Sequence, residues 1–308
     1  MKSILKLTGA LLMIPGAAVA AETLIAVPAV PDSVATTVFA INDNNVVAGS
    51  YTTSDGNEHG FFGTLNGSYT TFDSGFKNTQ VRGINNDGMV VGIGYDRKHS
   101  SVFERYPDGS IAYVTKGGKP LGFGVSGAIN TQGTFVADAF NRGGTKHFNF
   151  FGENAEYTNK IVTPGLSVSR PRGVNDSMDV AGYYQDDGGD LHGFLLTGGT
   201  ISTIDYPGAE GTIVYGINNA GEMAGIWGDR NDNPHAFIYD PASGFKSIIE
   251  KGSDNGKYAV SYGLNNEGLV AVNFVAADGP FIYCPHKASE CPSGANVSFK
   301  AGANAKQP

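Results

Sequence analysis

The chain has 308 residues, 41% of them hydrophobic, and its 21 basic and 29 acidic residues give a formal net charge of −8. Nucleic acid and anionic membrane surfaces both repel an acidic protein, so neither is expected as a partner. The 44 glycines indicate frequent tight turns, and helical periodicity is absent, so we expect an all-β protein.

The first twenty residues have the pattern of a secretory signal peptide. Lys2 and Lys6 precede an apolar stretch that includes Leu11 to Ile14, and Ala18-Val19-Ala20 provides a cleavage site of small residues. The apolar run is too short to span a bilayer, and no later run is long enough. We therefore expect cleavage after Ala20 or one residue later, no membrane span, and a secreted or periplasmic location.

One short phrase, Ile-Asn-Asn, recurs along the rest of the chain, in six imperfect copies spaced by 43 to 47 residues. The copies are Ile41-Asn42-Asp43, Ile84-Asn85-Asn86, Ile129-Asn130-Thr131, Val174-Asn175-Asp176, Ile217-Asn218-Asn219 and Leu264-Asn265-Asn266. Such an even period is typical of a repeat architecture.

The fifth unit shows what one repeat contains. Four short apolar stretches, residues 214–217, 222–227, 235–239 and 245–249, are separated by turns rich in Gly, Asn, Asp and Pro. Four short strands repeated at this period match the blades of a β-propeller. We predict a six-bladed β-propeller of four-stranded antiparallel blades over residues 21–292, followed by a C-terminal tail, residues 293–308.

The recurring Asn predicts a tight turn between the first and second strands of each unit. An Asn side chain can bond to its own backbone two residues later. Three residues after it stands a residue that tolerates positive φ. These residues are Asn45, Gly88, Gly133, Gly221 and Gly268. The fourth unit has Met178 instead, so we expect a distorted hairpin there. A structural role for the Asn residues is favoured over a functional ring.

The sixth unit shows only three strands before the two cysteines, so another segment must complete it. Alignment of the repeats predicts that Leu24 to Val30 supplies the fourth strand and closes the ring, which hides a sheet edge. Residues 295–299 are the competing candidate. In an oxidising compartment Cys284 and Cys291 are expected to form a disulfide, with a metal pair that includes His286 as the alternative.

Five histidines stand at or just before the third strand of their units: His59, His99, His147, His192 and His235. They predict either a partial ring for metal binding or proton transfer, or a repeated structural contact. An aromatic residue recurs nine residues after the leading Asn, and it either packs between blades or stacks on a sugar. From these two patterns the ligand-binding candidates are His59, His192, His235, Trp227, Tyr184 and Tyr51.

No catalytic motif is visible, so no catalytic residue is predicted. The loops Ser54 to Glu58, Gln185 to Asp190 and Asp229 to Asn233 alternate acidic and amide side chains, which is partly like calcium-binding loops. None has the full ligand spacing with a closing Glu. We expect no cofactor and no metal site, with calcium as the alternative.

The motif Gly-Ile-Asn-Asn-x-Gly-x-x-x-Gly, followed by His-Ala-Phe or His-Gly-Phe, resembles the bacterial extracellular HAF-repeat family. Residues Gly216 to Gly225 with His235-Ala236-Phe237 carry the motif best, and His192-Gly193-Phe194 also fits. The resemblance implies an extracellular repeat protein and no particular activity. Many members end in a Pro-Glu-Pro sorting signal, whereas this chain ends in Ala-Lys-Gln-Pro.

We expect a secreted, monomeric binding module that presents one face of the propeller to a glycan or a protein partner. One alternative is a secreted polysaccharide hydrolase or lyase that uses channel-facing His and acidic residues. The other is a structural protein of the envelope or matrix.

Overall fold

The computed structural model describes residues 23–121, 124–140, 147–166, 168–231, 233–248, 258–274, 279–286, 289–293 and 295–298. The predicted signal peptide lies outside these residues. The described part of the chain is all β and contains no helix, and hence no helix able to cross a membrane.

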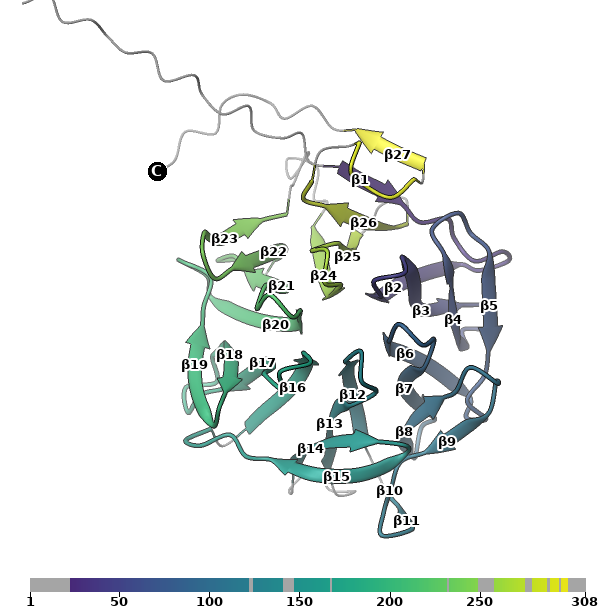
Figure 1. The fold of residues 1–308 in the computed structure, drawn as a ribbon, viewed down its shortest axis with the longest axis horizontal. Coiled ribbons are helices and arrows are strands. Elements are labelled where there is room, and N and C mark those ends of the chain that lie inside the picture. The colour runs from purple at the N-terminus through teal and green to yellow at the C-terminus, as the bar shows by residue number, and fades with distance from the viewer. Residues whose placement is uncertain are drawn as a thin grey trace, which may run out of the picture.

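The strands form six antiparallel sheets around a central axis, so the predicted six-bladed β-propeller is confirmed (Figure 1). The innermost strands are β2 (Ala35–Ile41), β6 (Asn78–Ile84), β12 (Gly124–Ile129), β16 (Val168–Val174), β20 (Gly211–Ile217) and β24 (Ala259–Leu264). The second strands are β3 (Val46–Thr52), β7 (Val90–Tyr95), β13 (Phe135–Phe140), β17 (Val180–Gln185), β21 (Met223–Gly228) and β25 (Val270–Phe274).

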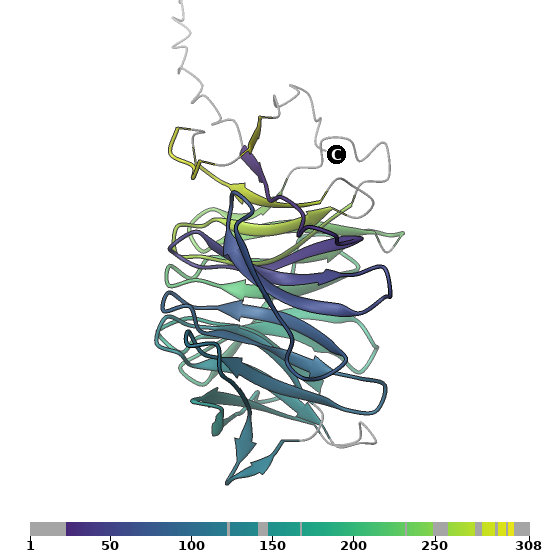
Figure 2. The same cartoon turned by 90° about the vertical axis from the view of Figure 1, so that its right-hand side faces the viewer.

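Two further strands complete each blade toward the rim of the disc, which Figure 2 shows edge-on. The third strands are β4 (Glu58–Thr64), β8 (Ser100–Arg105), β14 (His147–Glu153), β18 (Leu191–Thr197), β22 (Pro234–Asp240) and β26 (Pro280–Cys284). The outer strands of the first five blades are β5 (Tyr69–Phe72), β9 (Ile111–Tyr113), β15 (Glu156–Ile161), β19 (Thr200–Ile204) and β23 (Gly244–Ser247). The third blade also carries β10 (Thr115–Lys116) and β11 (Lys119–Pro120) at its outer edge.

The N-terminal strand closes the ring, as predicted. Strand β1 (Thr23–Ala26) pairs with β26 as the fourth strand of the sixth blade. The competing segment, β27 (Ala295–Ser298), pairs with the other edge of β1 and adds a fifth strand. Part of the predicted tail therefore belongs to the sheet. The predicted disulfide between Cys284 and Cys291 is confirmed, so these thiols cannot form the alternative metal pair.

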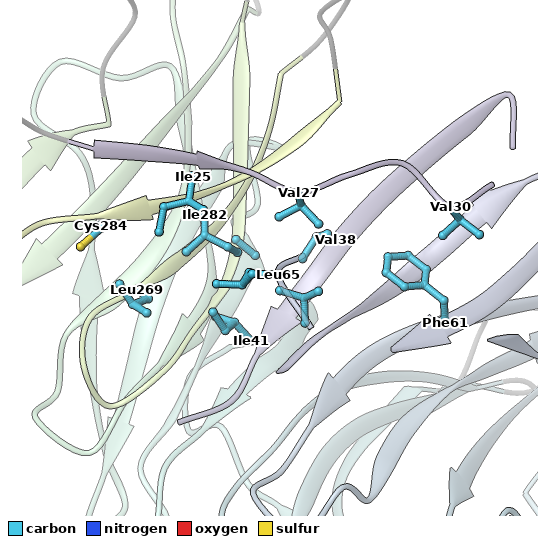
Figure 3. Close-up of a cluster of buried hydrophobic side chains, with 12 residues drawn as sticks. Ile25, Val27, Val30, Val38, Ile41, Phe61, Leu65, Leu269, Ile282 and Cys284 are labelled. Carbon is cyan, nitrogen blue, oxygen red and sulfur yellow. The ribbon is translucent and has the colours of Figure 1, made fainter. Parts of the chain in front are cut away.

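An apolar cluster fixes this closure between the sixth and first blades (Figure 3). Ile25 of the closing strand is fully buried and belongs to the same cluster as Ile282 and Leu269 of the sixth blade and Val38 and Phe61 of the first. Burial of such a side chain contributes about 1.5–3 kcal/mol. The same third-strand Phe is fully buried in the first five blades, as Phe61, Phe103, Phe150, Phe194 and Phe237.

The recurring Asn holds its own turn and also joins neighbouring blades. Asn42 Oδ1 accepts hydrogen bonds from the backbone N–H groups of Asn44 (3.0 Å) and Val46 (2.9 Å). Its Nδ2 donates to the carbonyl of Asn85 in the next blade (2.9 Å). In the sixth blade, Asn265 Nδ2 donates to the carbonyl of Asn42 (3.2 Å), which joins the last blade to the first. These bonds give the Asn residues the structural role that the sequence favours.

The fourth unit keeps this turn, so the predicted distortion at Met178 is wrong. Met178 adopts a φ of 63°, and its N–H donates to the carbonyl of Asn175 at 3.1 Å. Gly221 makes the same bond to Asn218 at 3.1 Å. Met178 therefore takes the left-handed conformation that Gly adopts at the corresponding position, and the hydrogen bonds of Asn175 hold it there.

Replacing Met178 by glycine is expected to raise the free energy of unfolding by about 1 kcal/mol. A left-handed side chain costs about 1–2 kcal/mol, and the greater unfolded-state entropy of glycine offsets part of the gain. Met178 is 41% exposed, so little packing is lost. Urea denaturation measures the change. Asn45→Gly, at a φ of 59°, is the control and should gain less, because Asn tolerates this conformation. A lower midpoint for Met178→Gly would contradict this account.

Small residues bring the inner strands close together. The second residue before each leading Asn is Ala40, Gly83, Ala128, Gly173, Gly216 or Gly263. A Cβ added to Gly173 would lie 2.8 Å from the backbone nitrogen of Ile217 in the next blade, which is too close for any larger residue. In every inner strand the register to the second strand shifts just here, which is a β-bulge. The bulge turns the residue three before the Asn toward the channel.

Candidate functional site

The central channel has two mouths, separated by an apolar ring. The residues just before the leading Asn form this ring, and all six line the first of two cavities along the axis: Ile41, Ile84, Ile129, Val174, Ile217 and Leu264. Four of them, Ile41, Ile84, Ile129 and Leu264, also line the second cavity. On one side of the ring lie the Asn turns, which we call the asparagine mouth. On the other side lie the bulge residues, which we call the arginine mouth. They are Phe39, Arg82, Gly127, Arg172, Tyr215 and Tyr262.

The asparagine mouth follows the repeat, and its polar groups largely satisfy one another. In every unit except the second, the backbone N–H of the residue after the leading Asn donates to the side chain of its counterpart in the next blade. The backbone N–H of Asp43 donates to Asn86 Oδ1 (3.0 Å), and that of Asn266 donates to Asp43 Oδ1 (2.8 Å). Burial raises the pKa of Asp43, but hydrogen bonds from Asn86 and Asn266 outweigh it, so the net shift is downward. The hydrogen bonds at this mouth therefore join neighbouring blades.

The arginine mouth departs from the repeat. The residue three before the leading Asn is Phe, Arg, Gly, Arg, Tyr and Tyr in successive blades, whereas the neighbouring layers keep one kind of residue. A scaffold needs equivalent residues at equivalent positions, whereas a ligand of lower symmetry needs different ones. The layer that departs from the repeat is therefore the candidate binding site.

Aromatic rings form one side of the arginine mouth. Tyr262 packs edge-on against Phe39, with ring centroids 4.7 Å apart, and against Tyr215, with centroids 4.9 Å apart. The guanidinium of Arg82 lies 4.5 Å from the centroid of Phe39, in a cation–π contact. Burial, together with Tyr262, raises the pKa of Tyr215 to about 12. Its hydroxyl is therefore neutral and can donate a hydrogen bond.

A buried carboxylate holds Arg172 on the other side. Asp138, on the second strand of the third blade, has a side chain only 1% exposed. Its Oδ1 accepts a bond from Arg172 Nη1 (2.9 Å), and its Oδ2 accepts one from Arg170 Nη1 (3.0 Å). The carboxylate thus fixes two arginines while neutralising one charge.

Arg82 has no such carboxylate. Its Nη2 donates to Gln80 Oε1, and Gln80 Nε2 donates to Glu58 Oε1 (3.0 Å). Within the described residues, Arg82 Nε is buried with no hydrogen-bond partner. Burial lowers the pKa of Arg82, and the charge of Arg172 acts in the same direction. The mouth therefore carries excess positive charge in an acidic protein.

The residues predicted from the sequence lie elsewhere, on the second and third strands of the first, fourth and fifth blades. Each predicted His faces its predicted aromatic partner on the neighbouring strand. The ring centroids are 5.2 Å apart for Tyr51–His59, 5.1 Å for Tyr184–His192 and 4.2 Å for Trp227–His235. The structure therefore brings these six residues together as three separate pairs, and neither channel mouth is lined by them.

Each of these histidines also contacts a carboxylate. His59 Nδ1 lies 2.7 Å from Asp73, and His192 Nδ1 lies 2.8 Å from Asp205. His235 Nε2 lies 3.2 Å from Asp229. These contacts tie the third strand to the loop before it or to the end of the outer strand. The repeated geometry matches the structural interpretation of the histidines, and their ligand-binding role stays a prediction.

Trp227 is covered on both ring faces. His235 stacks on it, and Tyr206 stacks on it with centroids 4.6 Å apart and planes 6° apart. A groove of about 310 Å³ runs past Trp227 between the fourth and fifth blades, with Asp190 and Glu210 also in its wall. A ligand in this groove could meet the indole edge, but it could not stack on a free face.

The acidic loops bond to their own turns. Asp229 Oδ1 accepts from the backbone N–H groups of Asn231 (2.8 Å) and Asn233 (3.0 Å). Asp55 and Asp186 cap their loops in the same way. Among the residues that the structure describes, no three His, Cys, Asp or Glu side chains gather in a geometry that could hold a metal ion.

Replacing Asp205 by asparagine is expected to lower the pKa of His192, because the hydrogen bond to Asp205 is the main cause that raises it. A raised folded-state pKa means that protonated His192 stabilises the fold below about pH 6.5, and that this contribution is lost as pH rises through the folded-state pKa. NMR titration of the His192 ring measures the shift. Asp187→Asn, in the exposed loop that precedes the His192 strand, is the control. An unchanged His192 titration in Asp205→Asn would count against this assignment.

The recurring motifs of the sequence do not include the residues of the arginine mouth. Arg occupies this position in two of the six units, as Arg82 and Arg172, and Tyr in two others, as Tyr215 and Tyr262, so no pattern common to all units predicted them. A signal was nevertheless present. Alignment of the six units on the leading Asn makes the third residue before it the one inner position where charge, size and aromaticity all change.

No family model matches the chain, and no match was found among curated proteins. Solved structures do match. TolB from Acinetobacter baumannii is 12% identical, with a TM-score of 0.55, over 78% of this chain and 63% of TolB. The β-propeller domain of the Trilobed protease from Pyrococcus furiosus is 10% identical, with a TM-score of 0.52, over 87% and 86%.

A virginiamycin B lyase from Staphylococcus aureus, solved with quinupristin, is 10% identical, with a TM-score of 0.52, over 85% of this chain and 98% of the lyase. Identities this low show a common fold and nothing about the ligand. The chain is thus a β-propeller, of a fold that other proteins use for binding and for catalysis.

Proposed function

We propose that the protein is a binding module that takes up a glycan or protein partner at the arginine mouth. The observation that carries this proposal is the break in the repeat. Four residue types, in Phe39, Arg82, Gly127, Arg172, Tyr215 and Tyr262, occupy equivalent positions in this layer, whereas the neighbouring layers keep one kind of residue. Aromatic and arginine side chains are also the residues that dominate binding energy at protein interfaces.

Export is part of the proposal. The disulfide between Cys284 and Cys291 suits an oxidising compartment, and the first twenty residues have the signal-peptide pattern. Both observations support a secreted or periplasmic location. The repeated Gly-Ile-Asn-Asn and His-Ala-Phe motifs further support membership of the extracellular HAF-repeat family.

Screens of the full chain test this function. The immobilised protein is tested against a glycan array and against extracellular proteins, and at least one saturable ligand is expected. Tyr262→Ala removes the ring that joins Phe39 and Tyr215, and it should abolish capture while the protein stays folded by thermal denaturation. Asn44→Ala, on the opposite face, is the control and should bind normally. Capture that survives Tyr262→Ala would exclude the arginine mouth as the site.

A polysaccharide hydrolase or lyase is the second candidate. The observation in its favour is the pairing of His59 with Asp73 and of His192 with Asp205 at hydrogen-bond distance, which is how enzymes orient a general base. This candidate predicts turnover of a polysaccharide by the wild type and its loss in His192→Ala. If no polysaccharide of a broad panel is turned over, the hydrolase or lyase activity is excluded.

A further inference from the structure

Arg82 is a cation that forms no ion pair with the residues that the structure describes. Its side chain lines the channel, and its one hydrogen bond to the described residues goes to the neutral amide of Gln80. Its Nε is buried without a hydrogen-bond partner among the described residues. The carboxylate of Asp138 binds Arg170 and Arg172. The charge of Glu58 acts on Arg82, but the carboxylate of Glu58 accepts a hydrogen bond from Gln80. A guanidinium removed from water without a direct ion pair is costly, so the mouth suits a negative group.

The chemistry of the mouth suits a carboxylate. A guanidinium offers two parallel N–H donors that match the two oxygens of a carboxylate. Tyr215 keeps its hydroxyl proton, because burial raises its pKa to about 12, and so it can donate to the same oxygens. Arg172 adds a second positive charge that Asp138 holds in place.

The shape of the mouth suits a small charged group better than a stacked sugar. The space open to the centre of a water molecule is about 50 Å³, and a carboxylate fits it. The rings of Phe39, Tyr215 and Tyr262 pack edge-on against one another, which does not suit stacking on a sugar.

We propose that the arginine mouth binds a single carboxylate carried by a peptide segment of a protein partner, with Arg82 as its direct ligand and Arg172 as the supporting charge. The carboxylate belongs either to the end of the chain or to an Asp or Glu side chain. This inference rests on the proposed binding function and names the chemical class of the partner.

Calorimetric titration of the full chain tests the inference with three probes at low ionic strength. The probes are a tetraglycine peptide with a free C-terminal carboxylate, the same peptide with a C-terminal amide, and an oligogalacturonate. The free peptide should bind and the amide should not. Arg82→Met should weaken binding by about tenfold or more, since a charge-assisted bidentate pair is lost. The affinity of Arg82→Lys for the free peptide should lie between those of the wild type and of Arg82→Met, because Lys cannot bind both carboxylate oxygens in the same plane.

Thermal unfolding separates this role from a structural one. Without ligand, Arg82→Met should be at least as stable as the wild type, because an unpaired buried cation is removed. A lowered Tm, or equal binding of acid and amide, would overturn the proposal. If the oligogalacturonate binds and the free peptide does not, the proposal that a peptide supplies the carboxylate is wrong. A captured partner that binds Arg82→Met normally but fails with Tyr262→Ala would overturn this inference while leaving the proposed function intact.

Discussion

Replacing Asn265 by alanine is expected to lower the free energy of unfolding by about 2–4 kcal/mol, because buried hydrogen-bonding groups lose their partner. Asn265 is 4% exposed. Its Oδ1 accepts from the backbone N–H groups of Glu267 (3.1 Å) and Leu269 (2.9 Å). Its Nδ2 donates across the ring closure to the carbonyl of Asn42 (3.2 Å). The substitution therefore breaks one turn and one contact between the last and first blades.

Urea denaturation followed by Trp227 fluorescence measures this loss. Asn44→Ala is the matched control, because Asn44 Nδ2 also donates to a carbonyl of the next blade (3.0 Å) but is exposed to water. Water replaces the exposed bond, so Asn44→Ala should cost less than about 1 kcal/mol. Equal losses for the two variants would show that the hydrogen bonds of the buried leading Asn residues do not hold the blades together.

Replacing Asp138 by asparagine is expected to lower the free energy of unfolding by about 2–4 kcal/mol, somewhat below the usual cost of breaking a fully buried ion pair. The side chains of Arg172 and Arg170 are 11% and 29% exposed, so water relieves part of the loss. Arg172 loses the carboxylate that holds it and becomes free to bind a ligand. We therefore expect a less stable protein that binds a carboxylate peptide more tightly.

A double-mutant cycle with Arg172→Met isolates the pair. Asp138→Leu leaves Arg172 without its carboxylate, and Arg172→Met leaves Asp138 with Arg170 as its ion-pair partner. The combined variant contains neither group of the Asp138–Arg172 pair, and Arg170 is unpaired from Asp138 in both variants that carry Asp138→Leu. The double variant should therefore lose less stability than the two single variants, Asp138→Leu and Arg172→Met, lose together. Denaturant midpoints and slopes supply the four values. Strict additivity would mean that Asp138 and Arg172 do not stabilise each other.

The fold could be predicted from the sequence because every repeat has a similar local pattern of residues. The Asn turn, the small residue before Ile and the buried third-strand Phe each recur, so the period and the strands could be predicted. The closing strand could also be predicted, since Leu24 to Val30 aligns with an outer strand. Met178 could not be placed, because only the structure shows that its turn hydrogen bonds outweigh the cost of a left-handed side chain.

The candidate site was not predictable in the same way. The site was predicted at the His and aromatic residues because they recur. Their pairing across neighbouring strands, as in Tyr184 and His192, is instead a contact that each repeat makes within its own blade. The channel residues depend on a β-bulge, which decides the side that Arg82 faces. The contact between Asp138 and Arg172 joins residues of different blades, and no spacing in the sequence reports it.

Hydroxyl-radical footprinting of the full chain with its captured partner tests the central claim most directly. If the arginine mouth is the binding site, Tyr215 and Tyr262 lose reactivity when the partner is bound, while Met178, exposed on the opposite face, keeps its reactivity. Protection of Met178 with unchanged labelling of the two tyrosines would place the partner on the opposite face of the propeller and contradict the account.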